Sequence, residues 1–430
     1  MKAKQLFGWI SIFVFSVFPV ALLFLFPSYY ARGTDFTSVT HRIGQVAGLI
    51  GMNLFALSFV LSTRLRFIEE IFDGLDKVYA VHAITGGLAL ISIMLHPIFL
   101  VLKFVPTSIK LAATYLLPGI HLSVNLGIIA LSGMIILLSL TFFVKIKYQL
   151  WKFSHEFFGF FFLIAAFHIW LVKDTIAMDE IFIGYPVYAM SISIIGLTAF
   201  IYSLIIRPLS KRTLYKVDSV KLTGSVCEVI MVPTGKSISY KSGQFIFVTF
   251  YKISREPHPF SIASGSNNHK LTIVAKNLGD YTARLGILKK GDKVLIEGPY
   301  GKFNFVEGND QVWLAGGIGI TPFMGMAEDI HAKPETNVTL YYSVKKTSEL
   351  VGIERFKEIQ KKLPNFKIIT KESDTQGFLN IEDIKKASSP LSSKVFLVCG
   401  PEGFKNSITT GLLNSGVIKK NIRLEDFNFR

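Results

Sequence analysis

The stretch HAITGGLALISIMLH, residues 82–96, determines how the first half of the chain is interpreted. It lies inside a long apolar run, and a histidine closes it at each end. Polar side chains within a membrane are costly and are therefore candidates for function. The first question that the sequence raises is therefore what His82 and His96 bind.

The stretch belongs to one of six apolar runs, each near or above the roughly 20 residues that a helix needs to cross a bilayer. The runs are Leu6–Phe26, Ile43–Leu61, Val78–Leu102, Leu122–Val144, Trp151–Val172 and Ile181–Ile206. The first exceeds the apolar core of a signal peptide, so we expect it to be retained as a helix. After Arg207 the chain changes to shorter strand and helix patterns. We therefore predict six membrane helices in residues 1–206, followed by a water-soluble portion.

Cationic residues in the short loops indicate the orientation of these helices. Lys145 and Lys147 lie between two apolar runs, and Arg207 and Lys211 follow the last one. The positive-inside rule assigns such loops to the cytoplasm. We therefore expect a multi-pass protein of the cell membrane, with both termini and the water-soluble portion in the cytoplasm.

The charge and the cysteine content exclude several classes of protein. The net charge is +16, but no clustered arm or stacking platform for nucleic acid is present. Membrane lipid and anionic nucleotides are the expected partners of such a basic surface. The chain has two cysteines, Cys227 and Cys399, and no Cys-x-x-Cys-His motif. This excludes a disulfide framework and covalently attached haem.

The spacing of the two histidines places them on one face of a helix. Fourteen residues separate His82 from His96, which corresponds to about 21 Å along the helix axis and about 40° around it. A second helix carries His155 and His168 in HEFFGFFFLIAAFH. With both helices running outward, His82 is level with His155, and His96 is level with His168.

The second helix does not follow the spacing rule as well. His155 and His168 are thirteen residues apart, which on an ideal helix turns them about 140° away from each other. A π-bulge or a local kink would correct this, and such bulges are common at functional sites. We predict a distortion of this kind near Gly159.

Two histidine pairs at matched depths are typical of bis-histidine haem sites. Neutral imidazole is a good ligand for haem iron, and helical bundles build such ligands into their cores. The alternative is that each histidine merely forms a hydrogen bond with a neighbouring helix. The matching of four residues on two helices favours two b-type haems, with His82, His96, His155 and His168 as the iron ligands.

The first part of the water-soluble portion has the pattern of a flavin-binding barrel. Strand and turn patterns alternate from Tyr215 to Phe305, which predicts a small antiparallel barrel. The motif HPFSIAS, residues 258–264, supplies a bend, an aromatic ring and a hydroxyl group for a flat isoalloxazine. In NLGDYTARL, Gly279 and Thr282 begin a predicted helix whose free N–H groups, together with Arg284, could bind a pyrophosphate.

The second part has the pattern of a nucleotide-binding α/β domain. QVWLAGGIGITPF, residues 311–323, predicts a strand, a glycine-rich turn and the start of a helix at Thr321 and Pro322. Glycines allow the backbone to approach a diphosphate, and the helix N-terminus favours its charge. NVTLYYSV, NFKIIT and KVFLVCG predict further strands.

These motifs resemble those of a known family. HPFSIAS, GDYT, GPYG, AGGIGITPF and VCGP are similar to the ferredoxin-reductase type of flavin–nicotinamide module. Joined to six helices with four histidines, they resemble the NADPH oxidase and ferric reductase superfamily, and most of all its compact bacterial NADPH oxidase homologues. The resemblance implies a six-helix membrane bundle at 1–206, an antiparallel β-barrel FAD domain at 207–305 and a Rossmann-like α/β NADPH domain at 306–430. It implies no obligatory protein activator, because calcium-binding and activator-docking extensions are lacking.

The resemblance also assigns site residues. The flavin would be held by His258, Pro259, Phe260 and Ser261, and its phosphates by Lys276, Gly279 and Thr282. The phosphates of the nicotinamide dinucleotide would be held by Gly316, Gly317, Gly319, Thr321 and Pro322, and the nicotinamide would lie near Cys399, Gly400 and Pro401. Ser343, Lys345 and Lys346 would bind the 2′-phosphate of NADPH. Phe427 would cover the isoalloxazine and move aside during turnover, so Ser261, Cys399 and Phe427 are the catalytic candidates.

Each of these assignments has a structural alternative. Phe427 could anchor the C-terminal tail, Cys399 could be a small buried residue at a strand end, and Lys345 and Lys346 could form an exposed basic loop.

The resemblance implies an enzyme that carries electrons across the membrane. Cytoplasmic NADPH would reduce FAD, and two haems would pass single electrons to oxygen outside, producing superoxide. The alternative is a ferric-chelate reductase that uses the same path. The oxidases are similar to one another in having an arginine and a further histidine near the haem edge. Here Leu100 lies one turn after His96, and the approximate equivalent of the arginine falls near Gln45, with Arg42 close by, which weakens the oxygen assignment. The spacing of thirteen between His155 and His168, in contrast, resembles the oxidases.

Overall fold

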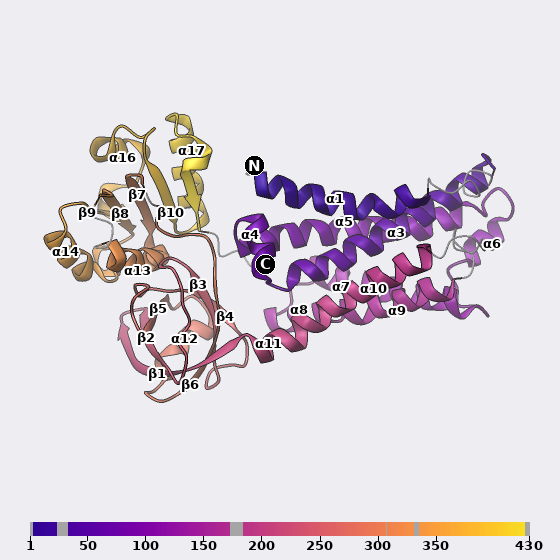
Figure 1. Ribbon diagram of the computed structural model, residues 1–430, viewed down its shortest axis with the longest axis horizontal. Coiled ribbons are helices and arrows are strands. Elements are labelled where there is room, and N and C mark those ends of the chain that lie inside the picture. Colours follow the sequence, from indigo (N-terminus) through magenta and orange to yellow (C-terminus); the bar gives the residue numbers. More distant parts are fainter. Residues whose placement is uncertain (1–2, 24–32, 173–183, 307, 331–334, 426–430) are drawn as a thin grey trace. The chain divides into compact units, whose positions relative to one another are not determined.

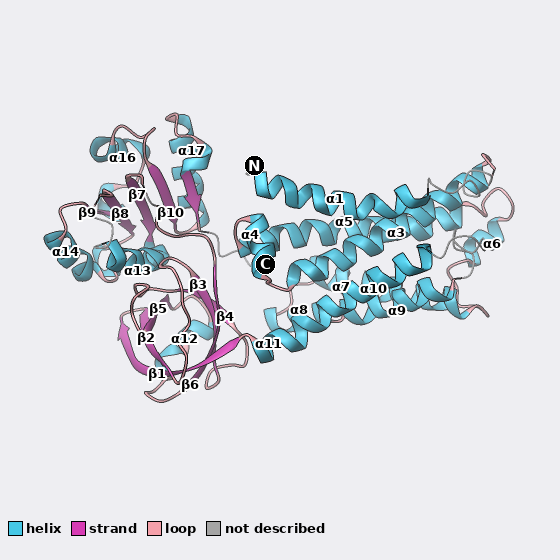
Figure 2. Ribbon diagram, in the orientation of Figure 1, coloured by secondary structure: helices cyan, strands magenta, loops and turns pink. Residues whose placement is uncertain are grey.

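The computed structural model describes residues 3–23, 33–172, 184–306, 308–330 and 335–425. The chain forms two compact units, Met1–Ser210 and Lys211–Arg430. In the described residues of the first unit all regular elements are helices, and strands occur in the second unit (Figure 2). This change of secondary structure follows the change of composition after Arg207.

Among the described residues, six helices of the first unit are long and apolar enough to cross a membrane, as the sequence predicts. The long helices of this unit run side by side (Figure 1). They are α1 (Ala3–Leu23), α3 (Phe36–Ser62), α4 (Arg66–Phe72), α5 (Leu75–Leu102), α6 (Ile109–Thr114), α7 (Leu122–Phe143), α8 (Tyr148–Glu156), α9 (Phe158–Leu171), α10 (Gly184–Ile201) and α11 (Arg207–Ser210). A π-helical turn, Tyr202–Ile206, joins α10 to α11.

Glycines on α3 allow α5 to pack closely against it. A Cβ atom at Gly44 would lie 3.0 Å from Leu100, one at Gly48 would lie 2.7 Å from Nδ1 of His96, and one at Gly51 would lie 2.7 Å from Ile93. Small residues at such contacts let helix backbones approach each other in membranes. The glycines therefore fix α5, and with it the histidines that α5 carries.

The first part of the second unit is a closed antiparallel barrel. Its strands are β1 (Arg212–Thr223), β2 (Val226–Pro233), β3 (Phe245–Phe250), β4 (His258–Ser261), β5 (Leu271–Lys276) and β6 (Lys293–Tyr300). They pair in the order β4-β3-β6-β1-β2-β5. Just beyond β4, the N–H of Ala263 donates to the carbonyl of Thr272 on β5 at 2.8 Å, so the two ends of the sheet meet around an apolar core.

The second part is a parallel sheet with helices on both faces. Its strands are β7 (Gln311–Gly316), β8 (Val338–Val344), β9 (Phe366–Glu372), β10 (Val395–Cys399) and β11 (Ile422–Leu424), in the order β11-β10-β7-β8-β9. The helices are α12 (Asp280–Ala283) in the barrel region and α13 (Thr321–Asp329), α14 (Ile353–Lys362), α15 (Ser373–Gln376), α16 (Ile381–Ser388) and α17 (Glu402–Asn414) in the parallel-sheet region.

Alternation along β7 explains the two layers of helices. Trp313 packs into one apolar core with Phe323 of α13, whereas Leu314 packs into a second core with Ile408 of α17. Successive side chains of a strand point to opposite faces, so β7, which is buried at every position, needs cover on both sides. The predicted fold class, a membrane bundle followed by a barrel and a Rossmann-like domain, is confirmed.

Candidate functional site

The structure brings the four histidines together as two pairs. The ring centroids of His82 and His155 are 6.1 Å apart with 66° between their planes. Those of His96 and His168 are 6.3 Å apart with 70° between their planes. We call His82 with His155 the first pair and His96 with His168 the second pair. In each pair, one ring comes from α5 and the other from the α8–α9 segment.

A helix break, and not a π-bulge, brings both histidines of the second segment into place. Helix α8 ends at Glu156 and α9 begins at Phe158, with Phe157 between them. Of the two predicted forms, the local kink is therefore present and the π-bulge is not, and the kink lies two residues before Gly159. Gly159 has another role, since a Cβ atom there would collide with the ring of Phe200 on α10.

Three of the four imidazoles are oriented by backbone carbonyl groups. The Nδ1 atom of His82 lies 2.9 Å from the carbonyl of Ser58, that of His96 lies 2.7 Å from the carbonyl of Gly44, and that of His168 lies 2.7 Å from the carbonyl of Ser123. A carbonyl only accepts, so Nδ1 carries the proton in each of these rings. The Nε2 lone pair is then free to bind a metal.

His155 is held differently from the other three. Its Nδ1 atom is buried and has no hydrogen-bond partner among the described residues. Its ring stacks on Trp151 at 5.1 Å with 23° between the planes, and Phe158 meets it at 70°. Aromatic packing therefore orients this ring where a hydrogen bond orients the others.

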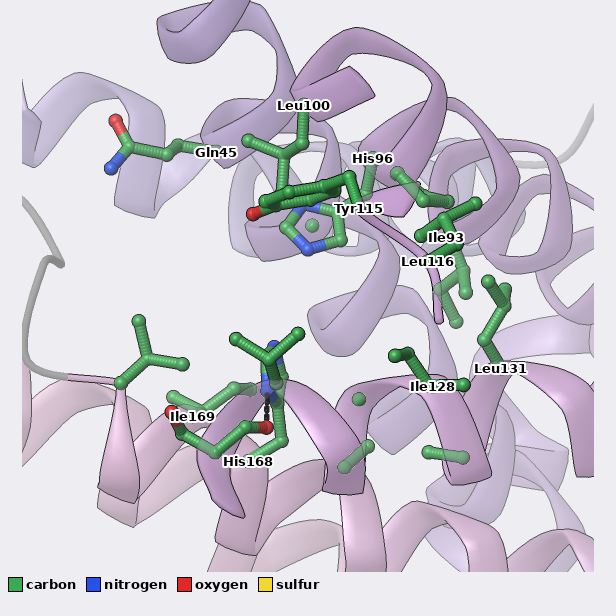
Figure 3. A pocket seen from close by; sticks show the side chains of 18 of the residues that line it. Gln45, Ile93, His96, Leu100, Tyr115, Leu116, Ile128, Leu131, His168 and Ile169 are labelled. Carbon is green, nitrogen blue, oxygen red and sulfur yellow. Dashed lines mark hydrogen bonds between the residues drawn. The ribbon is translucent and has the colours of Figure 1, made fainter. Parts of the chain in front are cut away.

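The second pair opens into a cavity of about 800 Å³. His96 and His168 extend into it from α5 and α9 (Figure 3). Glycine faces both rings: a Cβ atom at Gly48 would lie 2.7 Å from His96, and one at Gly127 would lie 2.9 Å from His168. The residues that leave room for the rings are thus part of the site.

The lining of this cavity is apolar apart from a few polar groups. None of the described residues that line it is an aspartate or a glutamate. Besides the second pair, the polar side chains are those of His41, Gln45, Lys103, Tyr115, His121 and Ser123. The cavity can therefore accept a large apolar group or an anion more easily than a cation.

The geometry of the two pairs fits iron held between two imidazoles. Two metal–nitrogen bonds of about 2.0 Å, together with the distance from the ligating nitrogen to the centroid in each ring, give ring centroids about 6 Å apart. The separations of 6.1 and 6.3 Å agree with this value. Three of the rings also have the tautomer that a metal ligand needs, and the cavity at the second pair offers room for a macrocycle.

In the barrel, the residues of HPFS form β4 and pack beside α12. The His258 ring stacks on Tyr281 at 3.6 Å, and the Phe260 ring lies 6.3 Å from Tyr281. The Tyr281 hydroxyl accepts the N–H of Phe250 and donates to the carbonyl of Val248. Burial raises the pKa of Tyr281 to about 12. Pro259 and the buried Ser261 complete the strand.

The residues predicted to bind a pyrophosphate lie where β5 ends and α12 begins. The Oγ1 atom of Thr282 accepts the N–H groups of Leu278 and Gly279 at 3.0 and 3.2 Å, so these two donors are not free. Arg284 donates to the carbonyl of Ile253 at 3.0 Å. Lys276 at the end of β5 forms an ion pair with Glu349 at 3.4 Å. Thr282 thus caps the turn that precedes α12, and the N–H groups it binds lie before the helix.

In the parallel sheet, the glycine-rich turn and the VCGP motif lie next to each other. Strand β10 pairs with β7, so Cys399 is beside Ala315. A Cβ atom at Gly319 would collide with the carbonyl of Cys399, and one at Gly316 would lie 3.1 Å from Pro401. The chain passes from β8 and β9 on one side of β7 to β10 on the other. Ligands bind α/β sheets at such a switch point, outside the carboxyl ends of the strands.

The remaining predicted residues lie around this edge. Gly317 has φ of +54°, a conformation that favours glycine. Thr321 and Pro322 begin α13 and are buried, and Gly400 lies between Cys399 and Pro401. Ser343 pairs with Gly316 across β7 and β8, and the exposed Lys345 and Lys346 follow. Phe427 lies outside the described residues.

Four contributors to these sites were missed from the sequence. In the sequence, Gly48 and Gly127 resemble any other glycine of an apolar helix. Only the packing of the helices shows that each faces a histidine ring. Trp151 and Tyr281 both stack on a predicted histidine. For Trp151 a signal was available, since it lies one helical turn before His155 and so on the same face.

Family comparisons agree with this arrangement. Residues 47–166 match the family described as "Ferric reductase like transmembrane component", and this segment contains three of the four paired histidines. Residues 211–304 match "FAD-binding domain", and residues 313–410 match "Oxidoreductase NAD-binding domain".

Individual relatives are similar over parts of the chain. One component of the Na(+)-translocating NADH-quinone reductase of Methylococcus capsulatus is 32% identical over 33% of this chain and 38% of its own length. Flavohemoprotein A of Dictyostelium discoideum is 33% identical over 33% of this chain and 36% of its own length. The chain thus spans less than two thirds of these relatives.

Among solved structures, a flavohemoglobin from Malassezia yamatoensis is similar in fold, with a TM-score of 0.50 and 16% identity over 92% of this chain and 100% of that one. The three matched segments, in their order along the chain, are the domain architecture of the NADPH oxidase and ferric reductase superfamily. The chain belongs to this superfamily, as a membrane protein with an FAD-binding domain and an oxidoreductase NAD-binding domain.

Proposed function

We propose that the protein is a transmembrane NADPH oxidase that produces superoxide. Electrons would pass from cytoplasmic NADPH through FAD and two b-type haems to oxygen outside the cell. The first pair would hold the inner haem and the second pair the outer one. The observation that supports this most is the presence of two imidazole pairs with separations of 6.1 and 6.3 Å, both built from the same two helical segments.

The residues at the flavin would orient a flat ring against β4. FAD, when bound, accepts two electrons from NADPH and releases them singly. We propose that His258, Pro259, Phe260 and Ser261 position the isoalloxazine, with the Ser261 hydroxyl near its reactive nitrogen. Lys276, Gly279 and Thr282 would lie along the phosphates. The stacking of His258 on Tyr281 supports this role because it fixes the strand that the flavin would contact.

The residues at the switch point would hold NADPH. Gly316, Gly317, Gly319, Thr321 and Pro322 would bind its phosphates, and Cys399, Gly400 and Pro401 would lie near the nicotinamide. The close approach of Gly319 to the Cys399 carbonyl supports this, since it brings both motifs to one crevice. Ser343, Lys345 and Lys346 would bind the 2′-phosphate, and Phe427 would cover the flavin until nicotinamide displaces it. We propose domain limits of 1–206, 207–305 and 306–430.

The electron acceptor has two candidates. A bis-histidine haem has no open coordination position, so oxygen would be reduced at the haem edge. The cavity at the second pair also favours a ferric chelate, because it has Lys103 and no carboxylate among its described lining residues. Leu100 and Gln45, near which the resemblance would place a histidine and an arginine in the oxidases, both line this cavity. The second candidate function is therefore a ferric-chelate reductase.

One experiment separates the two acceptors. Purified protein in detergent, supplemented with FAD, would be assayed for NADPH consumption and for cytochrome c reduction with and without superoxide dismutase. Dismutase-sensitive reduction in air is the expected result. Rapid anaerobic reduction of ferric citrate with little turnover in air would instead establish a ferric reductase.

A variant tests the electron path itself. In His82→Leu we expect NADPH to reduce the flavin at the wild-type rate, while the haem absorbance at the second pair stays oxidised. Equal haem reduction in His82→Leu and wild type would contradict a path through the first pair.

A further inference from the structure

Two serines offer a backbone carbonyl to a paired histidine, but they differ in what their side chains do. Ser58 on α3 accepts at its carbonyl from Nδ1 of His82, and its Oγ atom lies 3.0 Å from the same nitrogen. Ser123 on α7 accepts from His168 at its carbonyl, at 2.7 Å, and this is the one hydrogen bond between the two residues. Among the described residues, the hydrogen bonding of His82 therefore differs from that of His168 by one hydroxyl group.

The hydroxyl of Ser58 is held in a buried and well-defined place. The residue is 6% exposed. The hydroxyl of Ser62, one turn further along α3, lies 3.2 Å from the hydroxyl of Ser203. The carbonyl of Ser62 accepts a hydrogen bond from the Arg207 guanidinium at 3.1 Å. On α5, a Cβ atom at Gly86 would lie 3.6 Å from the Oγ atom of Ser58. The turn that carries Ser58 is thus tied to the π-helical turn after α10 and to the start of α11, and a glycine of α5 faces its hydroxyl.

We propose that Ser58 is a positioning residue that makes the haem at the first pair different from the haem at the second pair. This inference rests on the proposed function, since it requires a haem at each pair. With two acceptors at Nδ1–H, the His82 ring is fixed in rotation and its Nε2 becomes more basic. A more basic ligand favours oxidised iron and lowers the reduction potential.

The direction of this effect suits the proposed electron path. His155, the other ligand of the first pair, has no hydrogen-bond partner at Nδ1 among the described residues. The side chains that orient the first pair are therefore Ser58, which contacts His82, and Trp151, which stacks on His155. Lowering the potential of the inner haem makes the transfer of an electron onward to the outer haem more favourable.

The test is a redox titration of the haem absorbance of the full-length protein in detergent, for Ser58→Ala and for its matched control Ser123→Ala. Two midpoint potentials are expected in the wild type, and the variant His96→Leu, which removes a ligand of the second pair, identifies the one that belongs to the first. In Ser58→Ala the potential of the first haem should rise while the second stays in place. In Ser123→Ala, which keeps the carbonyl but removes a hydroxyl from the cavity at the second pair, the potential of the first haem should stay in place.

A conservative variant separates the hydroxyl from the volume of the side chain. Ser58→Thr should restore the wild-type potential, because it keeps the hydroxyl. If Ser58→Ala loses its haem, Ser58→Cys replaces it, since a thiol is a weak acceptor of similar size, and the same rise is expected.

Several results would overturn the proposal while leaving the proposed function intact. These are unchanged potentials in Ser58→Ala, equal shifts of both potentials, equal shifts in Ser58→Ala and Ser123→Ala, or a shift in Ser58→Thr as large as in Ser58→Ala. A wild-type protein that binds no haem would overturn both the proposed function and this inference.

Discussion

Helix α5 and the α8–α9 segment each carry two histidines, yet they do so in different ways. On α5 fourteen residues separate the histidines and the helix is continuous from Leu75 to Leu102. On the other segment thirteen residues separate them and the helix is broken at Phe157. The comparison shows that a spacing predicts a shared face only when the helix between the two residues is regular.

The largest effect is expected from a change in the number of residues between the histidines. One alanine inserted after Leu88 of α5 should rotate His96 by about 100° relative to His82 and abolish the second pair. The same insertion after Phe157 raises the spacing of His155 and His168 to that of α5, so both pairs should survive. The haem-to-protein ratio should fall by half in the first variant and stay unchanged in the second. Equal loss in both would show that the break has no compensating role.

A smaller effect is expected from the packing that holds α9 after the break. The Phe162 side chain is fully buried, and its ring lies 5.3 Å from Phe55 and 5.2 Å from Phe59. Phe162→Ala should lower the free energy of unfolding by about 3–5 kcal/mol, measured by thermal denaturation in detergent. Phe160→Ala is the control, because that ring is 54% exposed and its loss should have little effect. A similar destabilisation by both variants would contradict the assignment of Phe162 as the anchor.

A more local effect is expected where glycine faces a histidine ring. In Gly127→Ala the new methyl group would lie 2.9 Å from His168, so the ring must shift. We expect a lower haem occupancy at the second pair, measured from the absorbance change on reduction, with the first pair unaffected. Gly87→Ala is the control, because a Cβ atom there meets nothing within 4 Å. Wild-type occupancy in Gly127→Ala would show that the site has more room than the contact indicates.

The smallest effect concerns His155, whose Nδ1 atom has no hydrogen-bond partner among the described residues. Replacing Trp151 by leucine removes a stacking contact worth about 0.5–1.5 kcal/mol, so His155 should rotate more freely without leaving the iron. Electron paramagnetic resonance should then show broadened signals for the first haem only. Trp170→Leu, at a ring that is 49% exposed, should leave the spectrum unchanged. Broadening of both haem signals would indicate a general loosening of the bundle.

Much of this architecture could be predicted from the sequence because its signals are local. Apolar runs of membrane length identify the six helices, and the order of GGIG and VCGP indicates a nucleotide-binding sheet. The pairing of His82 with His155 also follows from spacing and direction alone. These features depend on residues within one segment, so no knowledge of the packing is needed.

The features that could not be predicted depend on contacts between segments. The break at Phe157 has no proline or glycine to mark it, and the nearby Gly159 is explained by its contact with Phe200. The double contact of Ser58 with His82 depends on the register of α3 against α5.

The π-helical turn Tyr202–Ile206 determines how the chain between α10 and α11 responds to the loss of a residue. A π turn holds one residue more than an α turn, and its hydrogen bonds run from i to i+5. A deletion of one residue would here restore a regular helix and leave Arg207 at nearly the same angle, because four α-helical residues turn the chain by about 400°, about as far as the five residues of the π turn do. The guanidinium would then stay at the Ser62 carbonyl. The chain between Ile201 and Arg207 should therefore tolerate the loss of one residue, whereas the same deletion within a regular helix would rotate everything that follows by about 100°.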